Sequence, residues 1–187
     1  MAVLTDYDVR RAARDTASRA YTTVEKALRD VRNTSRTSFD VFLSHAKLDA
    51  ELVLGVKAIL EGRGQTVYVD WIDDPHLDRS KVTPATADGL RRRMRQCTSL
   101  IYVYTRNATN SRWMPWELGY FDAYNGNVAV LPIAQSSSEG VYKGEEFVGL
   151  YPYVDVGTSV LWVHKSAHEY ADFREWRGRS DKLRPAA

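Results

Sequence analysis

Short apolar runs alternate with longer amphipathic stretches along most of the chain. The apolar runs cover residues 39–44, 66–69, 99–104, 128–133 and 153–156, and residues 160–163 are a possible further strand. Strands that are apolar along their whole length are typical of parallel sheets with both faces covered, and helices between them connect parallel neighbours. The pattern therefore predicts a doubly wound α/β domain.

Two of the intervening stretches carry the start and stop signals of helices. The first helix follows Asp49 and is stopped by Gly62 and Gly64, whereas the second begins with Thr83 as its N-cap and Pro84 at its first position. Their inward positions are Leu52, Val56, Ile59 and Leu60 in the first helix, and Ala87, Leu90, Met94 and Cys97 in the second. The outer face of the second helix is rich in arginine, which could contact phosphates or simply lie in solvent.

Two further segments connect or close these elements. Residues 70–82 are mostly polar and are predicted to form a long loop after the second strand. Residues 166–176 are predicted to form a short closing helix.

The first part of the chain has a helical pattern of its own. Residues 5–33 contain no proline or glycine, and apolar residues recur at spacings of three and four, which predicts an amphipathic helix. These apolar residues are Ala13, Ala17, Ala20, Val24, Leu28 and Val31. The stripe could pack onto its own domain or serve self-association. Polar residues at 33–38 interrupt the pattern, so the expected segments are an N-terminal helix (1–36), a main domain (37–177) and a flexible tail (178–187).

Composition narrows the possible partners and compartments. The 187 residues carry a formal net charge of +2, so charge alone favours neither nucleic acid nor an acidic membrane surface. A single cysteine, Cys97, excludes an internal disulfide framework and suits a reducing compartment. No apolar run reaches the roughly 18 residues that a membrane helix needs, and no leader pattern opens the sequence. We therefore expect a cytoplasmic protein without nucleic-acid or membrane partners.

One acidic residue lies in an unusually aromatic setting. If residues 111–125 form a helix, Glu117 shares one stripe with four aromatic residues; these are Trp113, Tyr120, Phe121 and Tyr124. Such a stripe faces protein, where an ionised carboxylate costs on the order of several kcal/mol unless it has partners. Glu117 is therefore either a functional acid or a structural residue. A structural Glu117 would accept hydrogen bonds from a neighbouring loop, or would pack its stem against Trp113 and leave its carboxylate in water.

The ends of the predicted strands gather further candidate residues. Ser44 and His45 follow the first strand, and segments 70–82 and 104–113 follow the next two. In doubly wound sheets ligands bind outside this edge, so Glu117 can face a cleft there that a mobile loop closes. A glycine-rich nucleotide fingerprint after the first strand is absent, and the histidines at 45, 76, 164 and 168 lack metal-ligand spacing.

Three motifs resemble those of the TIR (Toll/interleukin-1 receptor) domain family in its stand-alone bacterial form. Residues 39–45 (FDVFLSH) resemble the first box, residues 70–82 the BB loop, and residues 111–117 (SRWMPWE) the S-x-W-x-x-x-E box. They occur in order and at suitable separations along the chain. The resemblance implies a flavodoxin-like, mainly parallel sheet of about five strands, here with an added N-terminal helix.

The resemblance also implies an activity. Some TIR proteins cleave the nicotinamide glycosidic bond of NAD with the glutamate that is matched here by Glu117. The ribose gains positive charge as nicotinamide leaves, and a carboxylate on that face stabilises it. Trp113 would wall the ribose or stack on nicotinamide, although a core aromatic is an open alternative.

Four other positions are implicated by their places in the motifs. Ser44, His45 and Ser111 would line the substrate site, and Lys81 could approach phosphate. The acidic pair at positions 73 and 74 argues against such a loop-to-phosphate contact, however, because like charges repel.

The resemblance leaves the product and the biological role open. Water attack would give ADP-ribose, whereas attack by the substrate's own adenine or ribose would give a cyclic ADP-ribose isomer. Similarity to the TIR proteins of Thoeris antiphage defence implies self-association and a product that activates a separate effector. NAD is then the substrate, and no metal or other cofactor is expected. The alternative is a non-enzymatic interaction module that acts by TIR–TIR assembly.

Overall fold

A computed structural model describes residues 4–20, 22–24, 26, 36–74, 82–136, 146–166 and 168–178. Lys81 and most of the segment that resembles the BB loop lie outside these residues. In the described part of the chain no helix is long and apolar enough to cross a membrane.

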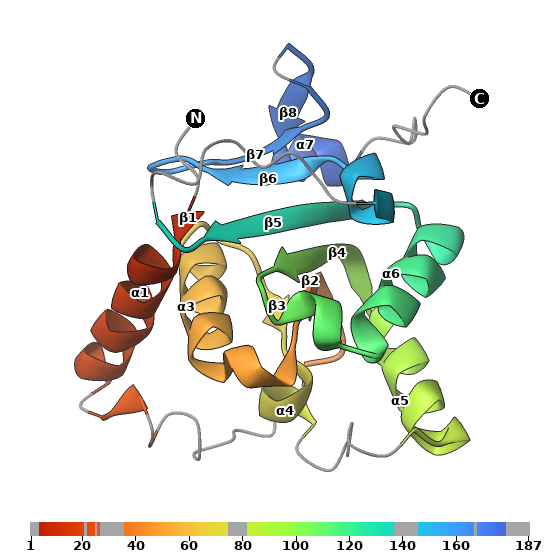
Figure 1. Ribbon diagram of the computed structural model, residues 1–187, viewed down its shortest axis with the longest axis horizontal. Helices are drawn as coiled ribbons and strands as arrows, with labels where there is room; N and C mark the ends of the chain where they lie inside the picture. Colours follow the sequence, from red (N-terminus) through yellow and green to blue (C-terminus); the bar gives the residue numbers. More distant parts are fainter. Residues whose placement is uncertain are drawn as a thin grey trace.

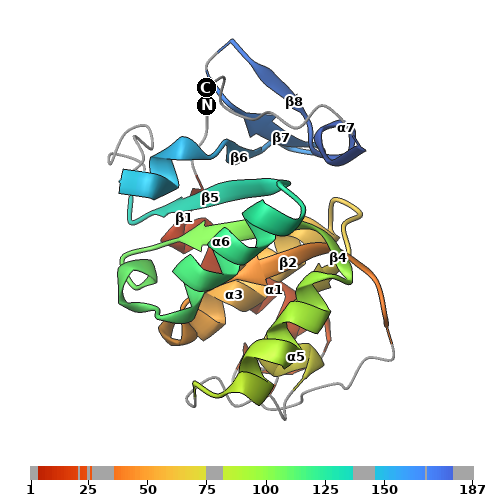
Figure 2. The ribbon, with the colours of Figure 1, turned by 90° about the vertical axis from the view of Figure 1, so that its right-hand side faces the viewer.

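A twisted sheet runs through the centre of the molecule (Figures 1 and 2). Its strands follow the order β3-β2-β4-β5-β6-β7-β8, and a two-residue strand, β1, pairs with the end of β5. The bounds are Leu4–Thr5 (β1), Phe39–Ser44 (β2), Val67–Tyr68 (β3), Cys97–Tyr104 (β4), Val128–Ala134 (β5), Tyr153–Val156 (β6), Leu161–His164 (β7) and Tyr170–Asp172 (β8). The pairs from β3 to β6 are parallel, and their order is that of flavodoxin-like folds. The predicted α/β fold class is confirmed.

Helices cover both faces of this sheet. α1 (Asp6–Arg19) and α3 (Ala50–Glu61) lie on one face, and α5 (Pro84–Met94) and α6 (Trp113–Tyr124) on the other (Figure 1). Each face has its own buried apolar cluster, because side chains of a strand alternate between the two faces. Short helical turns complete the described elements: η1 (Lys47–Asp49), α4 (Asp70–Asp73), η2 (Ala108–Asn110), η4 (Glu146–Leu150) and α7 (Phe173–Gly178).

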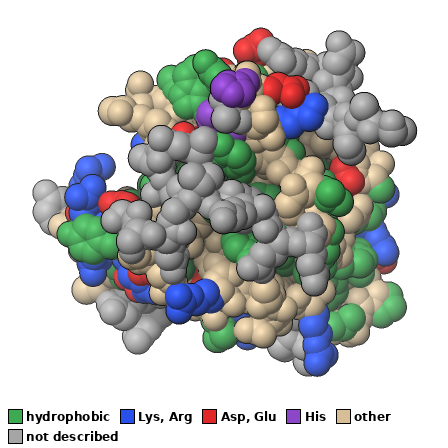
Figure 3. Space-filling view, turned by 45° about the horizontal axis from the view of Figure 1, so that its top comes forward, with side chains coloured by type: hydrophobic (Ala, Val, Ile, Leu, Met, Phe, Trp, Pro, Cys, Tyr) green, Lys and Arg blue, Asp and Glu red, His purple; other side chains and the backbone are tan. Residues whose placement is uncertain are grey.

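The sheet extends beyond the five strands of the prediction. β7, which matches the possible strand at 160–163, and β8 continue the sheet from β6 in antiparallel pairing. In this extension His164 of β7 pairs with Tyr153 of β6 and Tyr170 of β8. The imidazole ring stacks between the two phenol rings, with centroids 5.1 Å and 5.2 Å away. In Figure 3, where the top of Figure 1 is turned toward the viewer, histidine side chains lie beside hydrophobic ones. The predicted helix over 166–176 is therefore wrong in its first part, since cross-strand stacking forms β8 there and only α7 is helical.

The second correction concerns the start of the predicted polar loop. Residues Asp70–Asp73 form one turn of helix, α4, rather than loop. The Asp73 carboxylate accepts a hydrogen bond from the Val69 backbone N–H (2.8 Å) and so closes the turn. Trp71 and Ile72 pack against the apolar core, and this packing anchors α4. Cys97, expected on the helix stripe, instead begins β4.

The N-terminal helix is shorter than predicted and packs against its own domain. α1 begins with a capping box between Thr5 and Asp8 and ends at Arg19, so the prediction of one continuous helix from residue 5 to 33 is wrong. The last part of that prediction, residues 27–33, lies outside the described residues. Its backbone approaches α3 so closely that a Cβ on Gly55 would lie 2.0 Å from the Val9 carbonyl oxygen. Close packing of this kind needs glycine at the contact. Of the two uses considered for this helix, the described residues show intramolecular packing.

Candidate active site

A cleft lies outside the carboxyl ends of β2 and β4. These neighbouring strands mark the point where the order of the sheet reverses, which is where doubly wound folds bind ligands. The cleft has a volume of about 300 Å³. Its described lining residues are His45, Ala46, Lys47, Leu48, Val82, Asn107, Asn110, Ser111, Arg112 and Trp113.

Glu117 lies on α6, one helical turn after the cleft residue Trp113, and its exposed fraction is 0%. Ser44, the last residue of β2, donates a hydrogen bond from Oγ to Glu117 Oε2 at 2.6 Å. Ser44 is itself completely buried. The structure thus joins two of the predicted site residues, which are far apart in sequence, through a short charge-assisted hydrogen bond.

The carboxylate also influences a neighbouring tyrosine on β4. Burial raises the pKa of Tyr102, and the negative charge of Glu117 raises it further. Two groups that would both become anionic disfavour each other in a buried setting. Tyr102 is therefore held as a neutral phenol beside the Glu117 carboxylate.

The His45 ring is fixed by hydrogen bonds that point it toward α4. Nδ1 lies 2.8 Å from the Leu43 carbonyl oxygen and must carry the hydrogen, since a carbonyl only accepts. Nε2 accepts a hydrogen bond from Trp71 Nε1 at 3.2 Å and lies 3.4 Å from Asp70 Oδ1. His45 thus lies at the cleft as predicted, but its ring ties the strand end to α4.

Trp113 and Ser111 lie at the cleft as predicted, and their local contacts are visible. Trp113 is 9% exposed, and its ring meets the Trp116 ring edge-on at 5.4 Å. Ser111 Oγ accepts a hydrogen bond from the Met114 backbone N–H at 3.2 Å, which satisfies a donor in the first turn of α6. Ser111 therefore has a capping role beside its place in the cleft wall.

The aromatic stripe of α6 differs from the prediction. Trp113 and Phe121 are buried on the Glu117 side, but Tyr124 is 47% exposed. Tyr120 stacks on Trp116 and on Tyr124 along an outer row of the helix. The row begins at Trp116, four residues before Tyr120, so these two tyrosines belong to a neighbouring stripe that the sequence pattern did not separate.

One buried carboxylate near the cleft was not singled out from the sequence. Asp49 accepts hydrogen bonds from Thr105 Oγ1 and Asn107 Nδ2, both at 2.6 Å. These bonds join the start of α3 to the segment after β4, and Asn107 lines the cleft. The polar residues after β4 could be seen in the sequence, but the sequence did not show that they bind Asp49.

Two cations at the cleft were also missed. Lys47 and Arg112 are exposed and line the cleft from the segments after β2 and before α6. Among the described residues neither forms an ion pair with an acid. The described residues contain no group of three or more side chains that could hold a metal ion. The cleft thus combines a buried carboxylate behind it with positive charge at its surface.

The chain belongs to the TIR domain family, whose model matches residues 41–184. It is 50% identical over 144 residues to a protein of Bacillus cereus (strain MSX-D12) named "Probable 3' cyclic ADP-D-ribose synthase ThsB'", covering 74% of this chain and 75% of that protein. It is 30% identical over 83 residues to a protein of Cytobacillus dafuensis named "Putative cyclic ADP-D-ribose synthase TIR2". That second match covers 44% of this chain and 22% of that protein.

Proposed function

We propose that this protein is an NAD-consuming enzyme that releases nicotinamide and forms a cyclic ADP-ribose. The observation that carries the proposal is the 50% identity to the Bacillus cereus synthase over about three quarters of both chains. The buried pair of Glu117 and Ser44 beside the cleft supplies the acidic group that this chemistry needs.

The reaction breaks the bond between the ribose anomeric carbon and the nicotinamide nitrogen, and the bonding electrons leave with nicotinamide. Positive charge then develops on the ribose. A carboxylate near that face stabilises the charge electrostatically, and Glu117 has this role. The hydrogen bond from Ser44 orients the carboxylate, and Trp113 covers the ribose or nicotinamide from the cleft wall.

Ring closure follows when a nucleophile of the same substrate attacks the anomeric carbon. A ribose hydroxyl forms the new bond and loses its proton, or an adenine nitrogen forms it directly. Water attack at the same carbon would give ADP-ribose instead, so a cleft that excludes water favours the cyclic product. The 3′ linkage in the name of the Bacillus cereus relative makes the ribose hydroxyl our choice of nucleophile.

Lys47 and Arg112 are our candidates for binding the diphosphate of NAD. Both cations line the cleft. Among the described residues, neither cation forms an ion pair with an acidic side chain. Arginine and lysine are the usual ligands of phosphate groups. The two residues take the role that the sequence had suggested for Lys81.

Glu117 has no exposed surface, so its carboxylate must become accessible before it can contact the ribose. We infer that self-association of TIR domains favours an open form of the site. The product then acts as the signal for a separate effector, as the resemblance to Thoeris antiphage defence suggests.

Incubation of the purified protein with NAD, followed by mass spectrometry of the products, tests the activity. We expect nicotinamide and a cyclic ADP-ribose in equal amounts. Intact NAD after incubation at high protein concentration would contradict the enzymatic assignment and favour an interaction module.

Protein concentration tests the proposed role of self-association. Because assembly is a mass-action process, activity per molecule should rise with protein concentration and with a crowding agent. Specific activity that stays constant over a wide concentration range would contradict control by assembly, without affecting the assignment of the reaction.

A further inference from the structure

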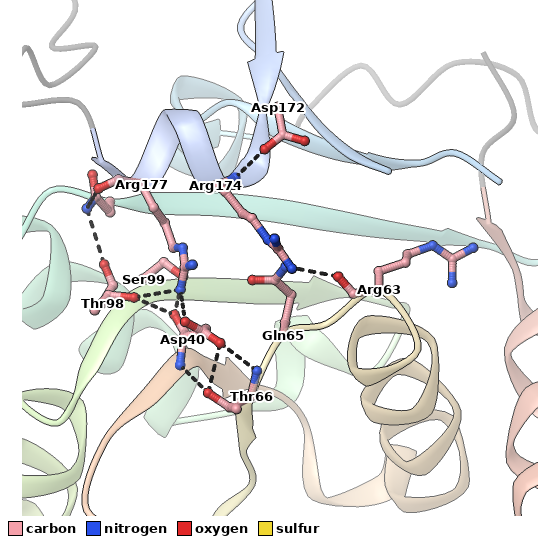
Figure 4. Close-up of polar contacts among 10 residues, drawn as sticks. Asp40, Arg63, Gln65, Thr66, Thr98, Ser99, Asp172, Arg174 and Arg177 are labelled. Carbon is pink, nitrogen blue, oxygen red and sulfur yellow. Dashed lines mark hydrogen bonds and ion pairs between the residues drawn. The ribbon is translucent and has the colours of Figure 1, made fainter. Parts of the chain in front are cut away.

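A second pocket shares no described lining residue with the cleft. It has a volume of about 210 Å³ and lies between the end of α3, the start of β3 and the β7–β8–α7 extension. Its polar lining residues include Arg63, Gln65, Asp172 and Arg174. Figure 4 shows these residues between the extension and α3. The cleft follows the carboxyl end of β2, whereas this pocket precedes the amino end of β3, so the two sites are separate.

Gln65 presents a buried acceptor at this pocket. The residue is 5% exposed, and its Nε2 donates a hydrogen bond to the Arg63 carbonyl oxygen at 3.2 Å. Because a carbonyl oxygen only accepts, this bond fixes which end of the amide faces Arg63. The other end, Oε1, is buried and has no hydrogen-bond partner among the described residues. Buried polar atoms without partners are uncommon, and a bound hydroxyl or N–H group would satisfy this one.

The Arg63 guanidinium brings positive charge to the pocket, and its hydrogen-bond acceptors among the described residues are backbone carbonyl oxygens. Nε and Nη2 donate to the Gly157 carbonyl oxygen (3.2 Å and 2.9 Å), and Nη1 donates to the Ile59 carbonyl oxygen (2.9 Å). These acceptors are neutral, and burial lowers the pKa of Arg63. Within the described part of the chain, three of its five N–H groups have acceptors, and the other two are available to a ligand.

The Arg174 guanidinium is the second positive group. It lies against the backbone of Gly64, where an added Cβ would be 2.7 Å from Arg174 Nη2. Gly64 has φ of +74°, a conformation that favours glycine and leaves room for the guanidinium. Neither Arg63 nor Arg174 forms an ion pair within the part of the chain that the structure describes.

Asp172 adds an acceptor beside the two cations. Its Oδ1 accepts hydrogen bonds from the backbone N–H groups of Arg174 (2.7 Å) and Glu175 (3.4 Å). The pocket therefore offers guanidinium donors together with two acceptors, a carboxylate and the Gln65 amide oxygen. A bare anion leaves the acceptors unsatisfied, and a neutral sugar leaves an excess of one positive charge, because the pocket has two guanidinium groups and one carboxylate.

We propose that this pocket binds a small phosphate monoester that carries free hydroxyl groups. Arg63 and Arg174 hold the phosphate oxygens, while Gln65 Oε1 and Asp172 accept hydrogen bonds from the hydroxyls. The proposal is independent of the reaction at the cleft, because none of these residues lines that site.

Isothermal titration calorimetry on the full chain, with ribose 5-phosphate as probe, tests this site. We expect ribose 5-phosphate to bind at least about tenfold more tightly than ribose or inorganic phosphate, since each lacks half of the recognised groups. Arg174→Ala should weaken binding at least about tenfold, because it removes charge-assisted hydrogen bonds. Gln65→Leu should weaken it less, through loss of one neutral acceptor.

Two control variants make the result specific. Arg95→Ala removes an exposed arginine after α5 and should leave binding unchanged. Lys47→Ala/Arg112→Ala removes the cations of the cleft and should also leave it unchanged. Binding that is lost in the cleft variant but kept in Arg174→Ala would overturn the proposal. Absence of ribose 5-phosphate binding to the unsubstituted chain, or equal binding of inorganic phosphate, would also overturn it.

Discussion

Two carboxylates, Asp40 and Glu117, meet opposite ends of the same strand, β2. Asp40 lies near the start of the strand and forms an ion pair with Arg177 of α7 (Figure 4). Its Oδ2 accepts hydrogen bonds from the Thr66 backbone N–H (2.7 Å) and side-chain hydroxyl (2.9 Å). Glu117 lies at the other end of β2, where the neutral hydroxyl of Ser44 donates to it.

The partners differ in a way that agrees with the roles proposed for the two acids, structural for Asp40 and catalytic for Glu117. Burial alone would raise the pKa of Asp40, but the hydrogen bonds from Arg177 and Thr66 outweigh it and hold the pKa below its ordinary value. The charge of Asp40 is thus compensated by an arginine of its own fold. Ser44, which donates to Glu117, is a neutral hydroxyl rather than a cation, and the proposed role of the Glu117 carboxylate is to stabilise positive charge on the substrate.

The largest effect should come from removing the negative charge of Glu117. Glu117→Gln keeps the size of the side chain and removes its negative charge. We expect NAD cleavage to fall at least about a hundredfold, the scale of one lost electrostatic stabiliser. Nicotinamide release measured at saturating NAD checks this.

Asp40→Asn is the matched control for that variant, since it removes one carboxylate from the other end of β2. Its turnover of NAD should stay close to that of the unsubstituted protein. If both variants lose activity equally, or if Glu117→Gln keeps full turnover, the distinction between the two acids is wrong.

A smaller effect should follow from removing the cations of the cleft. In Lys47→Ala/Arg112→Ala, the KM for NAD should rise about tenfold with little change in kcat, because the proposed role of these residues is to bind the diphosphate, away from the reacting bond. Arg95→Ala, which removes an exposed arginine away from the cleft, should leave both constants unchanged. A fall in kcat at constant KM would contradict the assigned role.

The main elements of the fold could be predicted from the sequence because their signals are local. The apolar runs of β2, β4 and β5 and the Thr83-Pro84 start of α5 needed no tertiary information. The short strand β8 and the one-turn helix α4 were missed because their stability comes from partners elsewhere in the chain, such as the stacked His164 ring. The early end of α1 was missed because nothing in the pattern near Arg19 resembles a stop signal.

The same division applies to the site. Glu117, Trp113 and Ser44 could be named from motifs, and the rule for strand ends correctly brought Ser44 and Glu117 together. Lys47 and Arg112 reach the cleft from segments whose paths depend on tertiary contacts, among them the bonds that Asp49 accepts. Sequence spacing contains no such information.

The smallest effect should be a loss of stability when the charge of Asp40 is removed. Asp40→Asn removes the negative charge that pairs with Arg177 and accepts hydrogen bonds from Thr66. We expect the free energy of unfolding at neutral pH to fall by about 1 kcal/mol. The expected loss is small because the ion pair is partly exposed to solvent. Chemical denaturation monitored by circular dichroism measures this difference. Asp88→Asn, at an exposed position on α5, is the control and should change stability little.

The pH dependence of that difference identifies its cause. Because the folded-state pKa of Asp40 lies below its ordinary value of about 3.9, its ionised form stabilises the fold above that pH. The stabilisation is lost as the pH falls through the lowered folded-state pKa, where the carboxyl becomes protonated in both states. The gap between the unsubstituted protein and Asp40→Asn should therefore be full at pH 6 to 7 and should close progressively below about pH 4. A gap that stays constant down to pH 2 would mean that the variant loses packing or hydrogen bonding rather than the charge interaction, and the contrast between the two acids would then rest on Glu117 alone.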